Sequence, residues 1–288
     1  MTDALPLRLG LPKGRIKDGV VKLLDDAGIE VQTGARNYRP SMSMEGIEAK
    51  LLKPQNIVEM LHIGSRELGF AGADWVAELD VDLVELLDTG LDPVRLVAAA
   101  PQDRAAPGKL PPQPLVVASE YERLTRKWIA DNELDATFVH SYGATEVFPP
   151  EDADCIVDNT ATGSTLRAND LVIVDVLMTS STRLYANPKA LDDPEKAAVI
   201  DRFVLMLESV LIARRRVMIE VNVSAERLDE VVDFLPCMRE PTISPLSGDA
   251  GFAVKAAVPR DQLTAIVPDL KERGGTDIVV TELAQIIP

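Results

Sequence analysis

The sequence is poor in the residues on which disulfide-stapled and metal-stapled proteins depend. It contains only two cysteines and two histidines in 288 residues. Cys155 and Cys237 are too few and too far apart for a disulfide framework or a zinc site, and their apolar neighbours predict buried thiols. His62 and His140 lack Cys, Ser or Asp neighbours at a useful spacing, so we expect structural or surface roles for them.

Long apolar runs and an excess of basic charge are missing as well. No run approaches the ~20 apolar residues of a membrane span, and Met1 is not followed by a basic and then an apolar segment. The formal net charge of −16 argues against binding nucleic acid or an anionic membrane. Small polyanions stay possible partners, because distant surface charge is screened within about 10 Å. We therefore expect a cytoplasmic protein.

What the sequence does contain is a regular alternation of short apolar strands and helices with apolar periodicity, which predicts an α/β protein of several domains. Expected strands cover residues 7–11, 47–52, 68–71, 94–100, 115–118, 136–140, 155–157, 171–178, 183–186, 217–223, 242–246, 251–258 and 277–281. Expected helices cover residues 16–27, 54–63, 121–131, 194–214, 225–235 and 261–272. Five prolines within residues 101–114 predict a connection between two lobes. The last part reads βαββαβ, which predicts a ferredoxin-like module.

The most informative stretch follows the expected strand at residues 155–157. Gly163 lets a ligand approach the backbone with no Cβ in the way, and a helix can begin at Thr165. Hydroxyl groups stand around this glycine, on Thr160, Thr162, Ser164 and Thr165. The pattern predicts a turn that holds a phosphate. The alternative is a ligand-free turn of the kind that joins many strands to helices.

Asp158 favours the ligand-binding interpretation. A carboxylate beside an anion cradle is repelled unless a sugar hydroxyl or a metal ion lies between them. We therefore expect a phosphorylated ribose together with Mg²⁺.

Two further turns could contribute to the same site. Lys13 and Arg15 flank Gly14 between a strand and a helix, so they could bind phosphates or simply be solvated. Asp74 follows the strand at residues 68–71, where it could cap a helix or reach a ligand.

Several short motifs, in the same order along nearly the whole chain, give it a family resemblance. They are LPKGR at residues 11–15, LG-x-x-G-x-D at 68–74, VRLVAAAP at 94–101, S-x-Y-x-x-L at 119–124, G-x-x-E-V at 143–147, D-x-x-x-x-G-x-TL-x-AN at 158–169 and PTISPL at 241–246. The chain resembles the ATP phosphoribosyltransferase family, in the long form with a regulatory domain. It departs from the usual pattern at Asn159, Thr160 and Ala161, where Ser or Val-Ser is common, and at Asp170, where Gly is common.

The resemblance implies a fold and its domain limits. The catalytic part would have two α/β lobes, like a type II periplasmic binding protein, with the active site between them. Lobe I would comprise residues 1–93 and 180–214, lobe II residues 94–179, and the ferredoxin-like regulatory domain residues 215–288.

The resemblance also implies a reaction, the first step of histidine biosynthesis. N1 of ATP attacks C1 of phosphoribosyl pyrophosphate and pyrophosphate leaves, with Mg²⁺ assisting. Asp158, Asn159, Thr160, Ala161, Thr162, Gly163, Ser164 and Thr165 would form the phosphoribosyl loop. Lys13 and Arg15 would be catalytic cations near ATP or pyrophosphate, with Asp74 and Tyr121 near the nucleotide. Asp158 and Glu146 would act on the sugar or the metal ion.

For the last domain, the resemblance implies feedback inhibition by histidine in a homo-oligomer, a dimer or a hexamer. Glu220, Thr242 and Ser244 match positions near the effector site of similar sequences. AMP is a further expected ligand.

Two alternatives differ in class. One is a non-catalytic small-molecule-binding protein of the same two-lobed fold, against which the missing export signal counts. The other is a type I phosphoribosyltransferase, whose acidic pair before T-G-x-T resembles the stretch from Asp158 to Thr165. Here the second acid is Asn159, and the trailing βαββαβ module does not belong to that fold.

Overall fold

A computed structural model of the chain describes residues 6–32 and 38–287. It comprises two compact units, Met1–Lys22 with Ile29–Asp201, and Leu23–Gly28 with Arg202–Pro288. Both units combine helices and strands, as the sequence predicts. In the described ranges, no helix is both long and apolar enough to cross a membrane.

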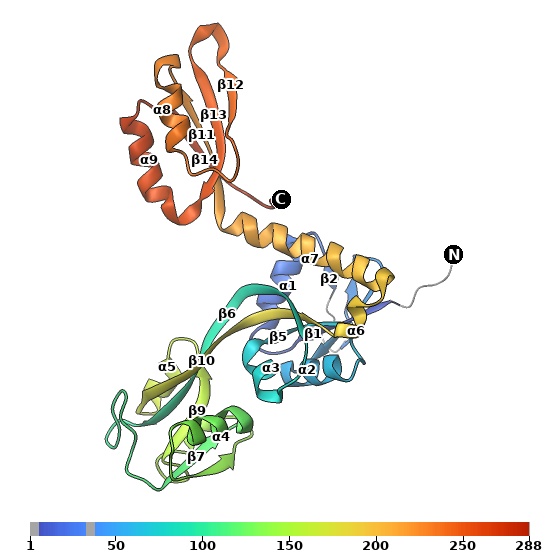
Figure 1. Ribbon diagram of the computed structural model, residues 1–288, viewed down its shortest axis with the longest axis vertical. Coiled ribbons are helices and arrows are strands. Elements are labelled where there is room, and N and C mark those ends of the chain that lie inside the picture. The colour runs from blue at the N-terminus through green and yellow to red at the C-terminus, as the bar shows by residue number, and fades with distance from the viewer. Residues whose placement is uncertain (1–5, 33–37, 288) are drawn as a thin grey trace. The chain divides into compact units, whose positions relative to one another are not determined.

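The first unit is built on an eight-stranded sheet in the order β4-β1-β5-β10-β6-β9-β7-β8. Its strands are β1 (Leu7–Pro12), β4 (Ile47–Leu52), β5 (Leu68–Gly72), β6 (Val84–Pro101), β7 (Leu115–Ser119), β8 (Ala136–His140), β9 (Cys155–Thr160) and β10 (Leu171–Ala186). Strand β1 runs parallel to β4 and β5, and β7 runs parallel to β8 and β9. The long antiparallel pair of β6 and β10 joins these two parallel groups (Figure 1). Two short strands, β2 (Val31–Gln32) and β3 (Ser41–Met42), pair separately.

The long pair differs from the prediction, because β6 begins at Val84 rather than at residue 94, and β10 is one strand rather than two. The added half of β6 contains Asp88, Gly90, Asp92 and Pro93, residue types that are rare in strands, and they hide its strand character. This segment forms a strand because it pairs with β10. Arg183 on β10 forms ion pairs with Glu85 at 2.7 Å and Asp88 at 3.5 Å. Register shifts between the two strands explain why neither shows a clean alternation.

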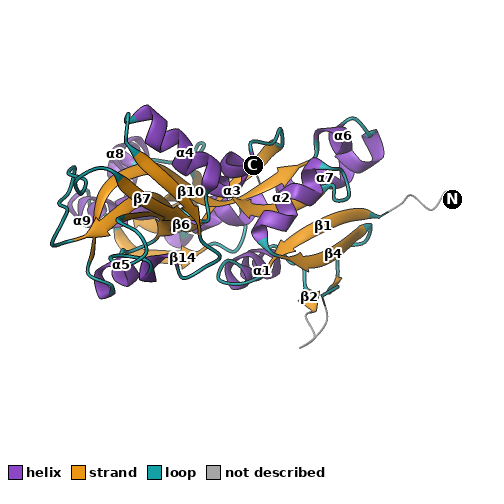
Figure 2. Ribbon diagram, turned by 90° about the horizontal axis from the view of Figure 1, so that it is seen from below, coloured by secondary structure: helices purple, strands orange, loops and turns teal. Residues whose placement is uncertain are grey.

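Helices cover the sheet where the sequence places apolar faces. They are α2 (Pro54–His62), α3 (Ala73–Leu79), α4 (Glu122–Asp131), η1 (Thr145–Val147), α5 (Ser164–Ala168) and α6 (Pro188–Leu191), and α1 (Lys17–Asp26) and α7 (Pro194–Arg214) each continue into the second unit. Helix α2 starts with Pro54, whose fixed φ suits a first helical position. It buries Ile57, Val58 and Leu61 and packs against β1 and β5. Figure 2 shows α2 beside β1.

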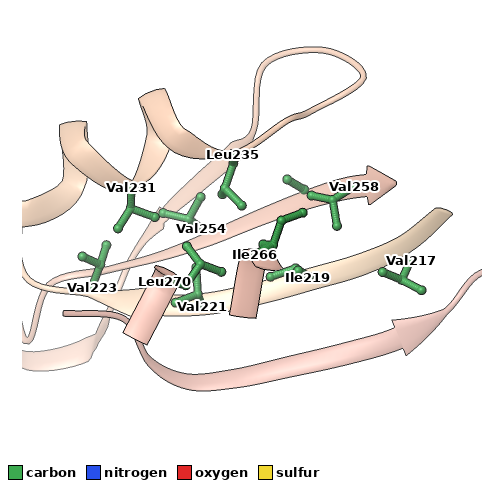
Figure 3. Close-up of a cluster of buried hydrophobic side chains, with 11 residues drawn as sticks. Val217, Ile219, Val221, Val223, Val231, Leu235, Val254, Val258, Ile266 and Leu270 are labelled. Carbon is green, nitrogen blue, oxygen red and sulfur yellow. The ribbon is translucent and has the colours of Figure 1, made fainter. Parts of the chain in front are cut away.

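The second unit contains a four-stranded antiparallel sheet in the order β12-β13-β11-β14. Its elements are β11 (Arg216–Val223), η2 (Ala225–Arg227), α8 (Leu228–Phe234), β12 (Thr242–Pro245), η3 (Ser247–Asp249), β13 (Phe252–Pro259), η4 (Arg260–Gln262), α9 (Leu263–Glu272) and β14 (Thr276–Glu282). Val231 and Leu235, in and just after α8, and Ile266 and Leu270 of α9 pack together onto the apolar face of the sheet (Figure 3). This order and chain path confirm the predicted ferredoxin-like module.

The remaining sequence expectations have mixed outcomes. Cys155 is fully buried, as predicted, but Cys237 is only half-buried, so that part of the prediction is wrong. The predicted boundaries between lobes I and II fall inside β6 and β10, which run through them without a break. The domain limits therefore stay a prediction.

Candidate functional site

The loop from Asp158 to Thr165 is shaped by hydrogen bonds of its own. Strand β9 continues to Thr160 instead of ending at residue 157, because it pairs with β6 up to the Arg95 and Thr160 partners. The hydroxyl of Thr160 then accepts the N–H of Gly163 at 2.9 Å, which closes the turn. Gly163 has φ of +73°, and a Cβ there would lie 3.0 Å from Arg167 Nη1. The left-handed backbone favours glycine at this position, whereas the end of the flexible Arg167 side chain could move away from a Cβ.

A polar cavity of about 280 Å³ opens above this loop. It is lined by Arg15, Val94, Glu146, Asp158, Asn159, Thr160, Ala161, Thr162, Ser164, Thr165 and Leu166. The side chains of Thr162, Ser164 and Thr165 are exposed toward solvent. Residues from four separate parts of the chain therefore meet around the predicted phosphate turn.

Helix α5, which follows the turn, has only five residues and begins at Ser164 instead of Thr165. So short a helix contributes little dipole of its own. The capacity to hold an anion therefore depends on the hydroxyl groups of the loop and on Arg15.

Carboxylates dominate the electrostatics of the cavity. The pKa of Asp158 is raised to about 6, mainly by burial and in addition by the charges of Glu146 and Glu120, while the hydrogen bond from the N–H of Asn159, at 2.7 Å, opposes the shift. Arg15 is the one cation that lines the cavity among the described residues, and it lies 3.6 Å from Asp92. The cavity therefore favours a ligand that brings both an anionic group and a cation.

The other predicted cation, Lys13, does not line this cavity. Its Nζ lies 3.8 Å from the centre of the exposed Tyr38 ring, a cation–π contact. The sequence therefore identified both cations of the turn, but only Arg15 is brought to the loop.

Asp74 and Tyr121 are brought together, but away from solvent. Tyr121 is fully buried and its hydroxyl donates to Asp74 Oδ2 at 2.6 Å. Asp74 reaches a smaller recess of about 70 Å³, which shares Arg15, Val94 and Asn159 with the larger cavity. Tyr121 lies behind the wall of this recess.

Three residues around the recess were not identified from the sequence. Asp92 lies in the part of β6 that was not recognised as a strand, and Ser180 lies between the two segments predicted in place of β10. Trp75 stacks on Tyr121, with ring centroids 4.5 Å apart. No spacing in the sequence links them to the loop, because tertiary contacts alone bring them there.

Comparison with known proteins decides the family. The model of the family "ATP phosphoribosyltransferase" matches residues 53–216, more than half of the chain, and the model "HisG, C-terminal domain" matches residues 213–285. The chain belongs to the ATP phosphoribosyltransferase family. Enzymes of this family carry out the first step of histidine biosynthesis, which favours the transferase over both alternative functions.

Individual relatives agree with this assignment. The ATP phosphoribosyltransferase of Prosthecochloris aestuarii is 35% identical over 286 residues, which cover 98% of this chain and 97% of the relative. That of Pelotomaculum thermopropionicum is 35% identical over 289 residues and is covered completely. The solved ATP phosphoribosyl transferase (HisG:HisZ) complex from Thermotoga maritima contains a chain that is 24% identical, with a TM-score of 0.62. The match covers 70% of this chain and 96% of the other, and it supports the fold.

Enzymes of the ATP phosphoribosyltransferase family generally need a divalent metal ion. Among the residues that the structure describes, no group of three His, Cys, Asp or Glu side chains could hold one. Asp158 and Glu146 nevertheless line the same cavity. Two carboxylates fit an ion that takes its other ligands from water and substrate phosphates.

The three predicted effector residues lie on the sheet of the second unit. Glu220 on β11 faces Lys255 on β13, with 2.6 Å between the charged atoms, and Thr242 on β12 faces the same lysine. Ser244 lies two residues further along β12, on the same face as Thr242. The sheet therefore aligns all three residues on one face.

Proposed function

We propose that this chain transfers the phosphoribosyl group of phosphoribosyl pyrophosphate to N1 of ATP at the loop from Asp158 to Thr165. A bond forms between N1 and C1 of the ribose, and the bond from C1 to the pyrophosphate oxygen breaks. The observation that carries the proposal is the cavity above the loop, where hydroxyl groups and Arg15 surround space for a phosphorylated sugar. Such a displacement needs positioning and charge neutralisation more than a protein nucleophile.

Each side chain has a defined part in this proposal. The hydroxyls of Thr162, Ser164 and Thr165 would donate to the ribose 5-phosphate, and Asp158 would accept from the ribose hydroxyls. Arg15 would bind the pyrophosphate or the ATP phosphates, with Lys13 available once its ammonium leaves the Tyr38 ring. Asp74 would face the nucleotide from the recess.

We propose Mg²⁺ as the metal ion, with Asp158 and Glu146 as its ligands, directly or through water. When bound, the ion supplies neutralisation of the departing pyrophosphate. The raised pKa of Asp158 supports a cation here, because burial and two neighbouring carboxylates leave its charge without a counter-ion.

Substitution of a loop hydroxyl tests the loop assignment. Thr165→Val keeps the shape of the side chain but removes a donor to the phosphate, so the KM for phosphoribosyl pyrophosphate should rise about tenfold. Thr137→Val, an exposed threonine on β8, is the matched control and should leave KM unchanged. Product is measured by mass spectrometry, and pyrophosphate release by a coupled assay.

The two possible failures of this experiment are distinct. A wild-type protein that forms no phosphoribosyl-ATP contradicts the reaction. An active wild type whose KM is unaffected by Thr165→Val contradicts the assignment of the loop.

We also propose regulation and assembly. Histidine would inhibit by binding at Glu220, Thr242 and Ser244, where its α-ammonium group would replace Lys255 as the partner of Glu220. The protein would work in the cytoplasm, where its substrates occur, as a homodimer or a homohexamer, with AMP as a further ligand.

A further inference from the structure

A chain of hydrogen bonds lies directly behind the recess that adjoins the phosphoribosyl loop. Asn159 Nδ2 donates to the hydroxyl of Tyr121 at 2.8 Å, and that hydroxyl donates to Asp74 Oδ2 at 2.6 Å. The hydroxyl of Ser180 donates to the other carboxylate oxygen, Oδ1, at 2.8 Å. These four residues come from β9, the start of α4, the start of α3 and β10. These hydrogen bonds therefore tie the loop to β10 and to the starts of α3 and α4.

The direction of these bonds is set by their chemistry. A carboxylate only accepts, so the hydroxyl of Tyr121 must donate to Asp74. The phenol oxygen can then only accept from Asn159, which turns the NH₂ of the carboxamide toward Tyr121 and its oxygen away. Burial of Tyr121, followed by the charge of Asp74, raises the pKa of the phenol, so the proton stays in place. The orientation of Asn159 is thus determined by a residue that lines neither cavity.

Packing holds the members of this chain in place. The ring of Tyr121 stacks on Trp75 with an interplanar angle of 25°. The carboxylate of Asp74 turns back over Gly72, where any Cβ would overlap Asp74 Oδ1. The backbone N–H of Asp74 also donates to the hydroxyl of Ser180 at 3.1 Å. These contacts fix the ring of Tyr121 and the carboxylate of Asp74. Removing the hydroxyl of Tyr121 should therefore change the position of Asn159.

Asn159 passes this constraint to the loop. Its side chain lines both the cavity and the recess, and its backbone N–H donates to Asp158 Oδ1 at 2.7 Å. A shift of Asn159 therefore moves the hydrogen-bond donor that orients the carboxylate of Asp158.

We propose that Tyr121 is a positioning residue, which touches no substrate and instead holds Asn159, and through it Asp158, in the geometry that the phosphoribosyl group requires. This inference rests on the proposed function of the loop. The proposed role of Tyr121 is therefore not direct contact with the nucleotide, because its side chain is completely buried. Asp74, in contrast, lines the recess, where it would contact a bound ligand directly.

The test removes one hydroxyl and keeps the ring. Tyr121→Phe preserves the stacking on Trp75 but frees Asn159, so the KM for phosphoribosyl pyrophosphate should rise about fivefold or more and kcat should fall about tenfold. Calorimetric titration with phosphoribosyl pyrophosphate and Mg²⁺ should show the same loss of affinity in the absence of ATP. The matched control is Tyr185→Phe, since Tyr185 is also a buried tyrosine, and its hydroxyl interacts with Arg183. It should lower the melting temperature by a similar amount and leave KM unchanged.

A second variant shows whether Tyr121 acts through Asn159. Asn159→Leu removes the same bond from its other end and should weaken phosphoribosyl pyrophosphate binding about fivefold or more. In that background, Tyr121→Phe should change KM by less than about twofold, because the link is already broken.

Three results would overturn the inference. One is an unchanged KM and affinity in Tyr121→Phe, with an active wild type. Another is full additivity of the two substitutions. If Tyr121→Phe does not fold, normal affinity in Asn159→Leu alone contradicts the proposal. A wild type without transferase activity contradicts the proposed function instead.

Discussion

At the scale of single residues, the charge that the fold constrains most strongly outside the site is Glu67. It is 5% exposed and meets two cations, with Arg8 Nη2 at 2.7 Å and Lys196 Nζ at 3.0 Å. Burial raises the pKa of Glu67, but hydrogen bonds from Arg8 and Lys196 more than offset it and lower the pKa to about 2. The two ion pairs of Glu67 link β1, the segment before β5 and the start of α7, three parts of the first unit.

Glu67 should therefore make stability depend on pH in a defined direction. Its pKa is lower in the folded than in the unfolded chain, so its contribution is complete above the unfolded value of 4.5 and is lost as pH falls toward about 2. Glu67→Gln should lower the free energy of unfolding by about 2 kcal/mol at pH 7. Thermal unfolding of both proteins from pH 7 to pH 2 measures this.

The two stability curves should converge in the acidic range. Glu122→Gln, which removes an exposed i,i+4 partner of Arg126, is the control and should cost no more than about 0.5 kcal/mol. A constant difference between wild type and Glu67→Gln at every pH would contradict the assignment.

At the scale of elements, the decisive unit is the strand, turn and short helix from Cys155 to Ala168. The turn depends on the left-handed conformation of Gly163, and Arg167 Nη1 closes it by donating to the carbonyl of Thr162 at 3.0 Å. A side chain at Gly163 would strain the backbone and displace Arg167 together. Loss of activity in such a variant therefore needs a control for strain alone.

Gly90 provides that control, since it has φ of +65° and open space where a Cβ would be. Gly163→Ala and Gly90→Ala should each lower the free energy of unfolding by about 1 to 2 kcal/mol. Only Gly163→Ala should also lower kcat/KM, by about tenfold, because it moves the loop. Chemical denaturation and steady-state kinetics compare the two variants. If kcat/KM were the same in Gly163→Ala as in Gly90→Ala, the shape of the turn at Gly163 would not matter for the reaction.

At the scale of the whole molecule, the proposed catalytic residues and the proposed effector residues belong to different units. The loop, the cavity and the recess all belong to the first unit, whereas Glu220, Thr242 and Ser244 belong to the second. If histidine binds as proposed, a substitution on the sheet of the second unit should change inhibition and leave the proposed reacting groups unaltered.

Glu220→Gln should separate the two properties. It removes the charge that would bind the α-ammonium group of histidine, so the concentration for half inhibition should rise about tenfold or more. The rate without histidine should stay as in the wild type. Glu226→Gln, a fully exposed carboxylate of the same unit, is the control and should leave inhibition unchanged. Unaltered inhibition in Glu220→Gln would place the effector elsewhere.

The fold was predictable wherever a local pattern carries the information. Apolar strands followed by polar turns indicated β1, β5, β7 and β9, and a period-3.6 pattern indicated α1, because an element buried on one face has apolar residues at a regular spacing. The predicted bounds of β4, β8 and α7 agree with the structure. The first half of β6 was missed, because its strand conformation depends on pairing with a distant segment, as between Val84 and Ala186, rather than on its own composition.

The candidate site divides in the same way. Short sequence motifs were enough to predict the glycine turn with its hydroxyl groups, the acid Asp158 before it and the cation Arg15. Their order along the chain was enough to predict the family. The burial of Tyr121, the separation of Lys13 from the cavity and the chain of hydrogen bonds from Asn159 to Asp74 arise from folding in three dimensions. Hydrogen bonds between side chains 38 and 47 residues apart produce no periodic pattern in the sequence. Their donors and acceptors come together only when the strands pair.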